Sequence, residues 1–311
     1  MHRLKLIILA LTFLVAISSE GRTADLQKGL SAYKKKDYAT ALRELVPLAE
    51  RGNPIAQSSL GAMYRSGRGV SQDYKTAVKW YRLAARQGFA EAQFKLGVAY
   101  DQGHGVPQDE KTAVKWYRLS AEQGDKQAQF NLGVMYELGE GVPKDEKTAL
   151  KWFRLSAEQG FAEAQTYLGS MYQLGLGVSK DDKAAVEWYR LSAEQGNASG
   201  QYNLGLMYEY GRGVPKDEKT ALKWYRLSVE RGYAEAQFRL GLAYETGHGV
   251  PKNHQTALKW YRLAADQGIA FAQVNLGVWY DHGYGVPKNH LRTAVTNWST
   301  VAAGFSQLRA G

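Results

Sequence analysis

The chain has 311 residues, 44% hydrophobic and 23% charged, which excludes a disordered polymer and, beyond the first residues, a bundle of membrane helices. Its formal net charge is +10, and the absence of cysteine excludes disulfides, thiolate metal sites and cysteine nucleophiles. The unusual feature is glycine, with 33 residues against 7 prolines and no Gly-x-y period that would indicate collagen.

The first 21 residues have the anatomy of a signal peptide. Arg3 and Lys5 precede an apolar run over residues 6–17. This run is too short to span a bilayer, which takes about 20 apolar residues. Small residues follow at positions 18, 19 and 21 and indicate cleavage there. We therefore expect a signal peptide over residues 1–21 and export to the periplasm or beyond in a bacterial host. An uncleaved membrane anchor is the alternative.

Residues 24–52 are expected to form a capping hairpin. Tyr33 precedes Ala41 by eight residues, whereas the corresponding spacing later in the chain is thirteen, so a connecting loop is missing here. Shortened terminal units are typical of repeat proteins, because an end has to be capped against solvent. Pro47 is expected to kink the second helix of this hairpin.

Residues 53–285 repeat with a period of 36. The motif Leu-Gly-x-x-Tyr begins at Leu60 and recurs without insertions until Leu276, giving seven copies. A Gly-x-Gly-Val loop and then an Asp or Asn follow each copy, and six copies continue to a Trp and a closing glycine. A fixed period of this length predicts tandem helical units that each contact only their neighbours.

Each copy predicts two helices joined by a glycine-rich loop. In the first copy Asn53 caps the first helix, and Asp73 caps a second helix that ends at Gly88. On the second helix, Trp80 and its neighbours recur at helical spacing and are expected at an interface between units. Gly61 lies inside the first helix, where glycine costs about 1 kcal/mol relative to alanine, so its recurrence indicates close approach by a neighbouring helix.

Residues 286–305 are expected to form a C-terminal capping helix and residues 306–311 a tail. Ala294 and Trp298 are displaced from the repeat register by one and two residues. The pattern as a whole predicts an all-α fold, a solenoid of eight antiparallel helical hairpins of which two are caps.

The unit Ala-x-x-x-Leu-Gly-x-x-Tyr, Gly-x-Gly-Val-x-x-Asp, Ala-x-x-Trp-Tyr-Arg-x-x-Ala-x-x-Gly resembles the Sel-one-like repeat (SLR) family, which is related to tetratricopeptide repeats. The resemblance covers residues 60–285 closely. It implies a right-handed α-solenoid that acts as an adaptor for protein partners. Some secreted members have a disulfide in each repeat and are linked to β-lactam binding, whereas this chain has no cysteine. An envelope-associated enzyme or β-lactam-binding protein of this secreted type is therefore the alternative function.

Candidate catalytic and metal-binding residues are few. The closest match to a penicillin-recognising Ser-x-x-Lys is Ser31 to Lys34, without the accompanying Ser-Asp-Asn or Lys-Thr-Gly. His254 and His290 lie one period apart, hence about 10 Å apart in adjacent helices, too far to share a metal ion. A weak metal site would have to use His282. We expect no catalytic residue, no metal and no cofactor.

Basic residues recur at two positions of the second helix and are expected to form rows on its outer face. Acids such as Glu122 and Glu158 are interspersed and dilute the positive potential, so we expect no nucleic-acid binding. Contact with an anionic envelope surface is left open. The rows contain Lys79 and Arg82, Lys115 and Arg118, Lys151 and Arg154, Lys223 and Arg226, and Lys259 and Arg262.

An acidic row lies five residues after each motif leucine, in the last turn of the first helix. A negative charge there opposes the helix dipole at a cost of about 0.3–1 kcal/mol, so something should compensate it. The alternatives are a local pair with a Lys or Arg of the adjoining repeat and a basic partner segment lying along the row. The position is occupied by Arg65, Asp101, Glu137, Gln173, Glu209, Glu245 and Asp281.

An aromatic row lies two residues before the motif leucine. The resemblance to tetratricopeptide repeats implies that the first helices line a concave face, so these aromatics are candidates for a peptide-binding surface beside the acidic row. Aromatic residues at helical spacing also form cores, and both interpretations stay open. The row contains Phe94, Phe130, Tyr202 and Phe238.

Together these features predict an exported, non-catalytic scaffold that binds protein or peptide partners through its concave face. The sequence decides neither the identity of the partner nor the oligomeric state.

Overall fold

The computed structural model describes residues 25–282, and within them the secondary structure is entirely helical, which confirms the expected all-α solenoid of consecutive hairpins. No helix in this range is long and apolar enough to cross a membrane. Residues 25–34 form a helix. The labelled helices that follow are α2 (Tyr38–Glu50), α3 (Pro54–Ser66), α4 (Tyr74–Arg86), α5 (Ala90–Gln102), α6 (Glu110–Glu122), α7 (Lys126–Leu138), α8 (Glu146–Glu158), α9 (Ala162–Leu174), α10 (Asp182–Glu194), α11 (Ala198–Tyr210), α12 (Glu218–Glu230), α13 (Ala234–Thr246), α14 (His254–Asp266) and α15 (Ala270–His282).

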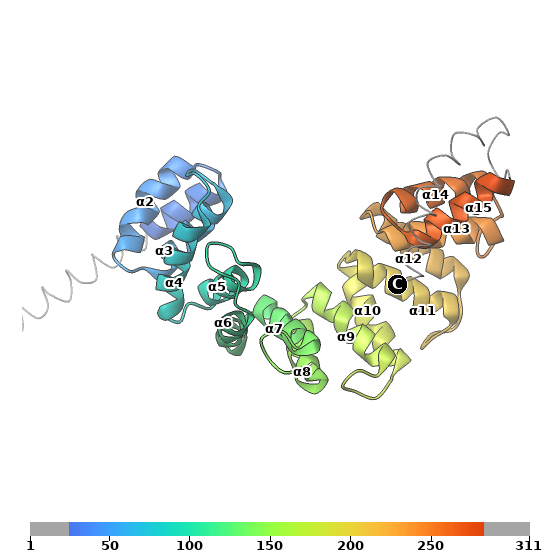
Figure 1. The fold of residues 1–311 in the computed structure, drawn as a ribbon, viewed down its shortest axis with the longest axis horizontal. Helices are drawn as coiled ribbons and strands as arrows, with labels where there is room; N and C mark the ends of the chain where they lie inside the picture. The colour runs from blue at the N-terminus through green and yellow to red at the C-terminus, as the bar shows by residue number, and fades with distance from the viewer. Residues whose placement is uncertain (1–24, 283–311) are drawn as a thin grey trace, which may run out of the picture. The chain divides into compact units, whose positions relative to one another are not determined.

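The helices pack in sequential pairs: α3 lies against α4, α5 against α6, α9 against α10, α11 against α12, and α13 against α14 (Figure 1). Contacts divide the chain into two compact units between Ser156 and Ala157, within α8. At the N-terminus the helix over residues 25–34 connects to α2 through a short turn without a glycine loop, and α2 includes Pro47. The expected signal peptide, the C-terminal capping helix and His290 lie outside the described residues.

Local capping explains where the helices begin and end. Asn53 Oδ1 accepts a hydrogen bond from the amide of Ala56 at 2.9 Å, and Asp73 accepts from the amides of the first turn of α4. These bonds satisfy amides that have no partner inside the helix. Gly67 ends α3 with φ +66° and Gly88 follows α4 with φ +85°, in the left-handed region that favours glycine. The caps predicted for the first copy are therefore confirmed.

In the six copies whose two helices are both described, the motif glycine of the first helix faces a large buried ring of the second helix. A methyl group at Gly61 would lie 2.6 Å from the Tyr81 ring, so the predicted close approach of two helices is confirmed. The same position is taken by Phe153 in the third repeat, and this column of rings is almost fully buried. The preceding residue of the second helix, Trp80 in the first repeat and Trp152 in the third, is only half-buried, against the core of the preceding hairpin.

Two sets of buried polar side chains connect the helices. Within a hairpin, Ser120 Oγ donates to the carbonyl of Ala90 at 2.8 Å. Also within this hairpin, Gln123 Nε2 donates to the side-chain oxygen of Gln93 at 2.7 Å, whereas between hairpins Gln93 Nε2 donates to the carbonyl of Ala85 at 3.2 Å. These bonds recur in other repeats, and they give the buried polar side chains hydrogen-bond partners.

Candidate functional site

Two pockets occupy equivalent positions four repeats apart, each between one hairpin and the first helix of the next. The first lies among α3, α4 and α5 and has a volume of about 220 Å³. The second lies among α11, α12 and α13 and has a volume of about 260 Å³. We call them the first and second interhairpin pockets. Their equivalent residues are Arg65 and Glu209, Tyr81 and Tyr225, Lys95 and Arg239, and His104 and His248.

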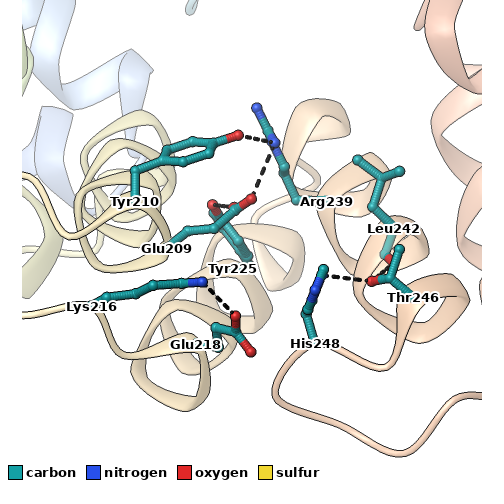
Figure 2. A network of polar contacts seen from close by, with 9 residues as sticks. All are labelled: Glu209, Tyr210, Lys216, Glu218, Tyr225, Arg239, Leu242, Thr246 and His248. Carbon is teal, nitrogen blue, oxygen red and sulfur yellow. Dashed lines mark hydrogen bonds and ion pairs between the residues drawn. The ribbon is translucent and has the colours of Figure 1, made fainter.

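The second interhairpin pocket is built around the carboxylate of Glu209 (Figure 2). Tyr225, from the second helix of the same hairpin, donates its hydroxyl to this carboxylate. Arg239, from the next hairpin, lies 3.3 Å from Glu209 and also donates to the Tyr210 hydroxyl at 2.8 Å. Burial and the adjacent negative charge of Glu209 raise the pKa of Tyr225. A carboxylate here is thus held between a phenol and a guanidinium.

The rim of the second pocket carries further polar pairs. Lys216 lies 2.8 Å from Glu218 and holds the pKa of that carboxyl below its usual range. On the opposite side, Thr246 and His248 share a hydrogen bond of 2.9 Å, and the Thr246 hydroxyl also bonds to the backbone carbonyl of Leu242 at 2.7 Å (Figure 2). The pocket therefore combines an apolar wall with charges of both signs.

The first interhairpin pocket has the same framework with a different charge. Arg65 stands where the second pocket has Glu209, and Lys95 stands where it has Arg239. Burial, followed by the charge of Arg65, lowers the pKa of Lys95, and burial raises the pKa of Tyr81 to about 12. Tyr74 and His104 stack at 4.7 Å between ring centroids and form one side of the pocket. The first pocket is therefore cationic.

Carboxylates of the acidic row bind to tyrosines inside the fold. The Tyr117 hydroxyl donates to Asp101 at 3.0 Å, as Tyr225 does to Glu209, and Tyr261 donates to Glu245. Among the described side chains of the row, Glu209 alone is also paired with a cation of the adjoining repeat, which was one of the two expected arrangements. Sequence reasoning missed the tyrosine, although it stands sixteen residues after the acid in these copies. The side chain of Asp281 lies outside the described set.

Glu137 is the exception in the acidic row, because the residue at the tyrosine position of its hairpin is Phe153. Phenylalanine has no hydroxyl to donate. Burial is the main cause that raises the pKa of Glu137, opposed by the charge of Lys144. A carboxyl whose pKa is raised by folding destabilises the folded state progressively as the pH rises through that pKa.

We therefore expect Phe153→Tyr to stabilise the protein at pH 7 by about 1 kcal/mol, because the new hydroxyl can donate to Glu137 as Tyr225 does to Glu209. The hydrogen bond favours the charged carboxyl and lowers its pKa, so the gain should be present at pH 7 and shrink as Glu137 is protonated. Urea denaturation at pH 7 and pH 4 measures both effects. The same substitution in a Glu137→Gln background is the control, and an equal gain there would contradict the explanation.

The aromatic row packs against the buried ring column. The centroid of Phe94 lies 6.0 Å from that of Tyr117, and Phe238 lies 5.7 Å from Tyr261. Phe94 is 7% exposed and joins the core of its own hairpin, whereas Phe130, Tyr202 and Phe238 are half-buried. Phe94 is therefore a core residue that also borders the first pocket, and the other three combine packing with partial exposure.

The two basic rows of the second helices differ from one another. The lysines, such as Lys79 and Lys115, are exposed as expected. The arginines instead donate to the motif tyrosine in the first helix of the next hairpin, which corrects their placement as a purely outer-face row. The described pairs are Arg82 and Tyr100 at 3.1 Å, Arg118 and Tyr136 at 2.7 Å, Arg190 and Tyr208 at 3.4 Å, Arg226 and Tyr244 at 3.4 Å, and Arg262 and Tyr280 at 2.9 Å.

A row of exposed leucines on the second helices was missed by sequence reasoning. Each follows the repeat arginine by one residue, which is the signal that could have revealed it. Between 36% and 45% of the side chain is exposed at each position. The row contains Leu83, Leu119, Leu155, Leu191, Leu227 and Leu263.

The catalytic and metal-binding candidates do not assemble into a site within residues 25–282. Ser31 and Lys34 are both exposed, on the helix of residues 25–34. His248 bonds to Thr246, and the ring of His254 packs edge-on against Trp279 at 5.2 Å. In this range no group of three or more His, Asp or Glu residues is arranged to hold a metal ion.

Comparison with known proteins identifies the repeat. The Sel1 repeat family model matches residues 54–89, 90–125, 126–161, 162–197, 198–233, 234–269 and 270–295. One similar solved structure is that of c5321, a protective antigen of uropathogenic Escherichia coli strains with an SLR fold. Its sequence is 38% identical, and the two structures superpose with a TM-score of 0.78. The match covers 90% of this chain and 62% of that protein. A Sel1 repeat protein from Oxalobacter formigenes is 37% identical with a TM-score of 0.72, covering 77% of this chain and 96% of that one. No curated protein matches the chain.

Proposed function

Because the chain belongs to the Sel1 repeat family, a scaffold-type family whose members often mediate protein interactions, we propose that it is an exported, non-catalytic scaffold that binds protein or peptide partners. The partners would bind along the first helices, which line the concave face in tetratricopeptide repeats. The observation that carries this proposal is the pair of interhairpin pockets at equivalent positions, each with an apolar floor and a charged rim. Side chains of an extended or helical partner fit such sites as anchors.

Export is proposed from the N-terminal sequence. Two basic residues, a twelve-residue apolar run and small residues follow one another in the order of a signal peptide. Fractionation of cells that express the full chain should place a shortened form outside the cytoplasm, with its new N-terminus near residue 22. A full-length form that stays in the membrane fraction would support the anchor instead.

Site-specific photo-crosslinking tests the binding surface. A photoreactive phenylalanine at Gln127, an exposed residue beside the first pocket, should give discrete adducts in cells that export the chain. The same photoreactive residue at Lys79, which is exposed on α4 and does not line the pocket, is the matched control and should give none. The captured protein, once purified, should bind the chain in calorimetry, and Val98→Glu in the pocket wall should weaken that binding at least tenfold. Equal adducts from both positions would contradict the proposal.

The enzyme alternative is tested with a hydrolase panel that includes a chromogenic β-lactam. We expect no turnover above the uncatalysed rate. Turnover that Ser31→Ala abolishes would replace the scaffold with an envelope enzyme, because a serine nucleophile at this position would then be required.

The exposed lysine and leucine rows favour a second candidate function, contact with an anionic envelope surface. Cations attract anionic headgroups by about 1 kcal/mol each, and leucine side chains add apolar area. Co-sedimentation with anionic vesicles should be lost with neutral vesicles and reduced by Leu83→Ser together with Leu119→Ser. If the unmodified protein, with both rows intact, does not bind anionic vesicles, this candidate function is excluded.

A further inference from the structure

In the first interhairpin pocket, two cationic side chains and a buried phenol meet, and no Asp or Glu is among the residues that line it. Tyr81 is 1% exposed, and no group within residues 25–282 accepts the proton of its hydroxyl, although the nearby Arg65 interacts with the hydroxyl and opposes the rise of its pKa. The neighbouring Arg65 and Lys95 cannot accept its proton, because guanidinium and ammonium groups only donate. A buried hydroxyl whose proton has no acceptor is unfavourable, and natural structures rarely leave one.

The second interhairpin pocket shows which acceptor this framework takes. There the carboxylate of Glu209 lies between the Tyr225 hydroxyl and the Arg239 guanidinium (Figure 2). The first pocket retains the tyrosine and a cation at the equivalent positions, but Arg65 replaces the glutamate. What is missing from the first pocket is therefore a carboxylate.

The acidic residues near the first pocket do not supply the missing carboxylate. Glu91 and Asp125 influence Lys95 electrostatically, yet neither lies within ion-pair distance of it among the described residues. Burial and the charge of Arg65 both disfavour the protonated form of Lys95, so an incoming anion would relieve an existing repulsion. The volume of about 220 Å³ exceeds the roughly 30 Å³ of one water molecule several-fold.

We propose that Arg65, Tyr81 and Lys95 form a carboxylate-binding site, with Ala77 and Val98 in its apolar wall contacting the carbon atoms that carry the carboxylate. Arg65 and Lys95 neutralise the charge, and the Tyr81 hydroxyl donates to one oxygen. The site recognises an acidic side chain or a C-terminal carboxylate. The identification of a partner protein as the source rests on the proposed scaffold function, whereas the site itself does not.

Four small probes distinguish the two sources at constant ionic strength. N-acetyl-glutamate N-methylamide presents a side-chain carboxylate, and its glutamine counterpart is the neutral control. N-acetyl-alanine presents a terminal carboxylate, and its amide is the control. In NMR titrations of the full chain, the carboxylate of the right source should shift the amide signals around Tyr81 and Lys95 saturably, and the neutral controls should not. The absence of any saturable shift from either acid would overturn the proposal.

Three variants assign the binding to the site. Arg65→Glu rebuilds the internal carboxylate of the second pocket, so it should raise the Tm and weaken the probe at least tenfold. Tyr81→Phe keeps the ring and should weaken the probe about threefold, which is about 0.6 kcal/mol for one hydrogen bond. Lys95→Met keeps the length of the side chain and should weaken it further. Unchanged affinity in Arg65→Glu would show that the probe binds elsewhere and would overturn the assignment.

The reverse substitution gives an independent readout. Glu209→Ala leaves Tyr225 and Arg239 without their carboxylate, so it should lower the Tm, and acetate should restore it more than chloride at equal ionic strength. No selective restoration would contradict the idea that this framework recruits an external carboxylate. If photo-crosslinks at Gln127 fail while the probes bind, the scaffold function falls and the site stands. If crosslinks persist in Arg65→Glu and the probes do not bind the unmodified chain, the scaffold function stands and the carboxylate site falls.

Discussion

Phe153→Ala should destabilise the protein by about 3–5 kcal/mol, the usual cost of removing a buried aromatic side chain. Phe153 is fully buried. Its ring lies against Gly133 and at 5.6 Å from the ring of Phe130, so truncation leaves a cavity between α7 and α8 that the helices cannot fill without moving. Chemical denaturation measures the loss.

Trp152→Ala is the matched comparison, because Trp152 is the adjacent residue on α8 and is the larger side chain. It is half-buried at the interface with the preceding hairpin, so we expect a cost of about 1–2 kcal/mol from the smaller apolar area removed from water. In a repeat protein the damage is local, so hydrogen exchange should show lost protection in α7 and α8 first for Phe153→Ala. A cost for Trp152→Ala as large as that for Phe153→Ala would contradict the burial order.

Gly105→Ala is expected to cost about 3 kcal/mol or more, because it combines two penalties. Its φ of +76° lies in the left-handed region, where a residue with a Cβ pays about 1–2 kcal/mol. A methyl group there would also lie 2.8 Å from the backbone nitrogen of Lys75 and closer still to the carbonyl of Tyr74. Backbone at the start of α4 cannot move away as a side-chain end can, so the overlap adds to the strain.

Gly103→Ala separates the two penalties. Gly103 has a similar φ of +69°, but its nearest contact to an added methyl group is 3.5 Å, an ordinary van der Waals distance. It should therefore cost only the conformational penalty of the left-handed region, about 1–2 kcal/mol. Denaturation midpoints of the two variants give the comparison. Equal losses would mean that the second glycine of the loop is selected by its conformation alone and not by contact with the preceding hairpin.

The acidic row and the proposed carboxylate site occupy the same position of successive repeats but differ in which groups are free to contact a partner. Asp101, Glu209 and Glu245 already accept hydrogen bonds from buried tyrosines, so the acidic row is largely committed to the fold. Arg65 departs from that row and removes the internal acceptor from one hairpin. A partner would then be recognised where the repeat deviates from its own pattern, not where it conforms.

The sequence by itself determined the helical hairpins, their caps and the repeat family, because these depend on short-range spacing. The left-handed glycines and the capping residues Asn53 and Asp73 act within a few residues of the chain. A fixed period of 36 residues predicts a solenoid, because stacked identical hairpins bury every copy in the same way. The close packing at Gly61 could also be predicted, since a recurring helix glycine needs a compensating contact.

Only the tertiary structure decided which side chains meet across helices. The partner of Asp101, Glu209 and Glu245 is a tyrosine sixteen residues away. The partner of five repeat arginines is a tyrosine eighteen residues away in the next hairpin. Both pairings depend on the rotation of one helix against another, which periodicity leaves free. The same is true of the first pocket: Arg65, Tyr81 and Lys95 lie on three helices, and their unequal burial appears only once those helices are packed.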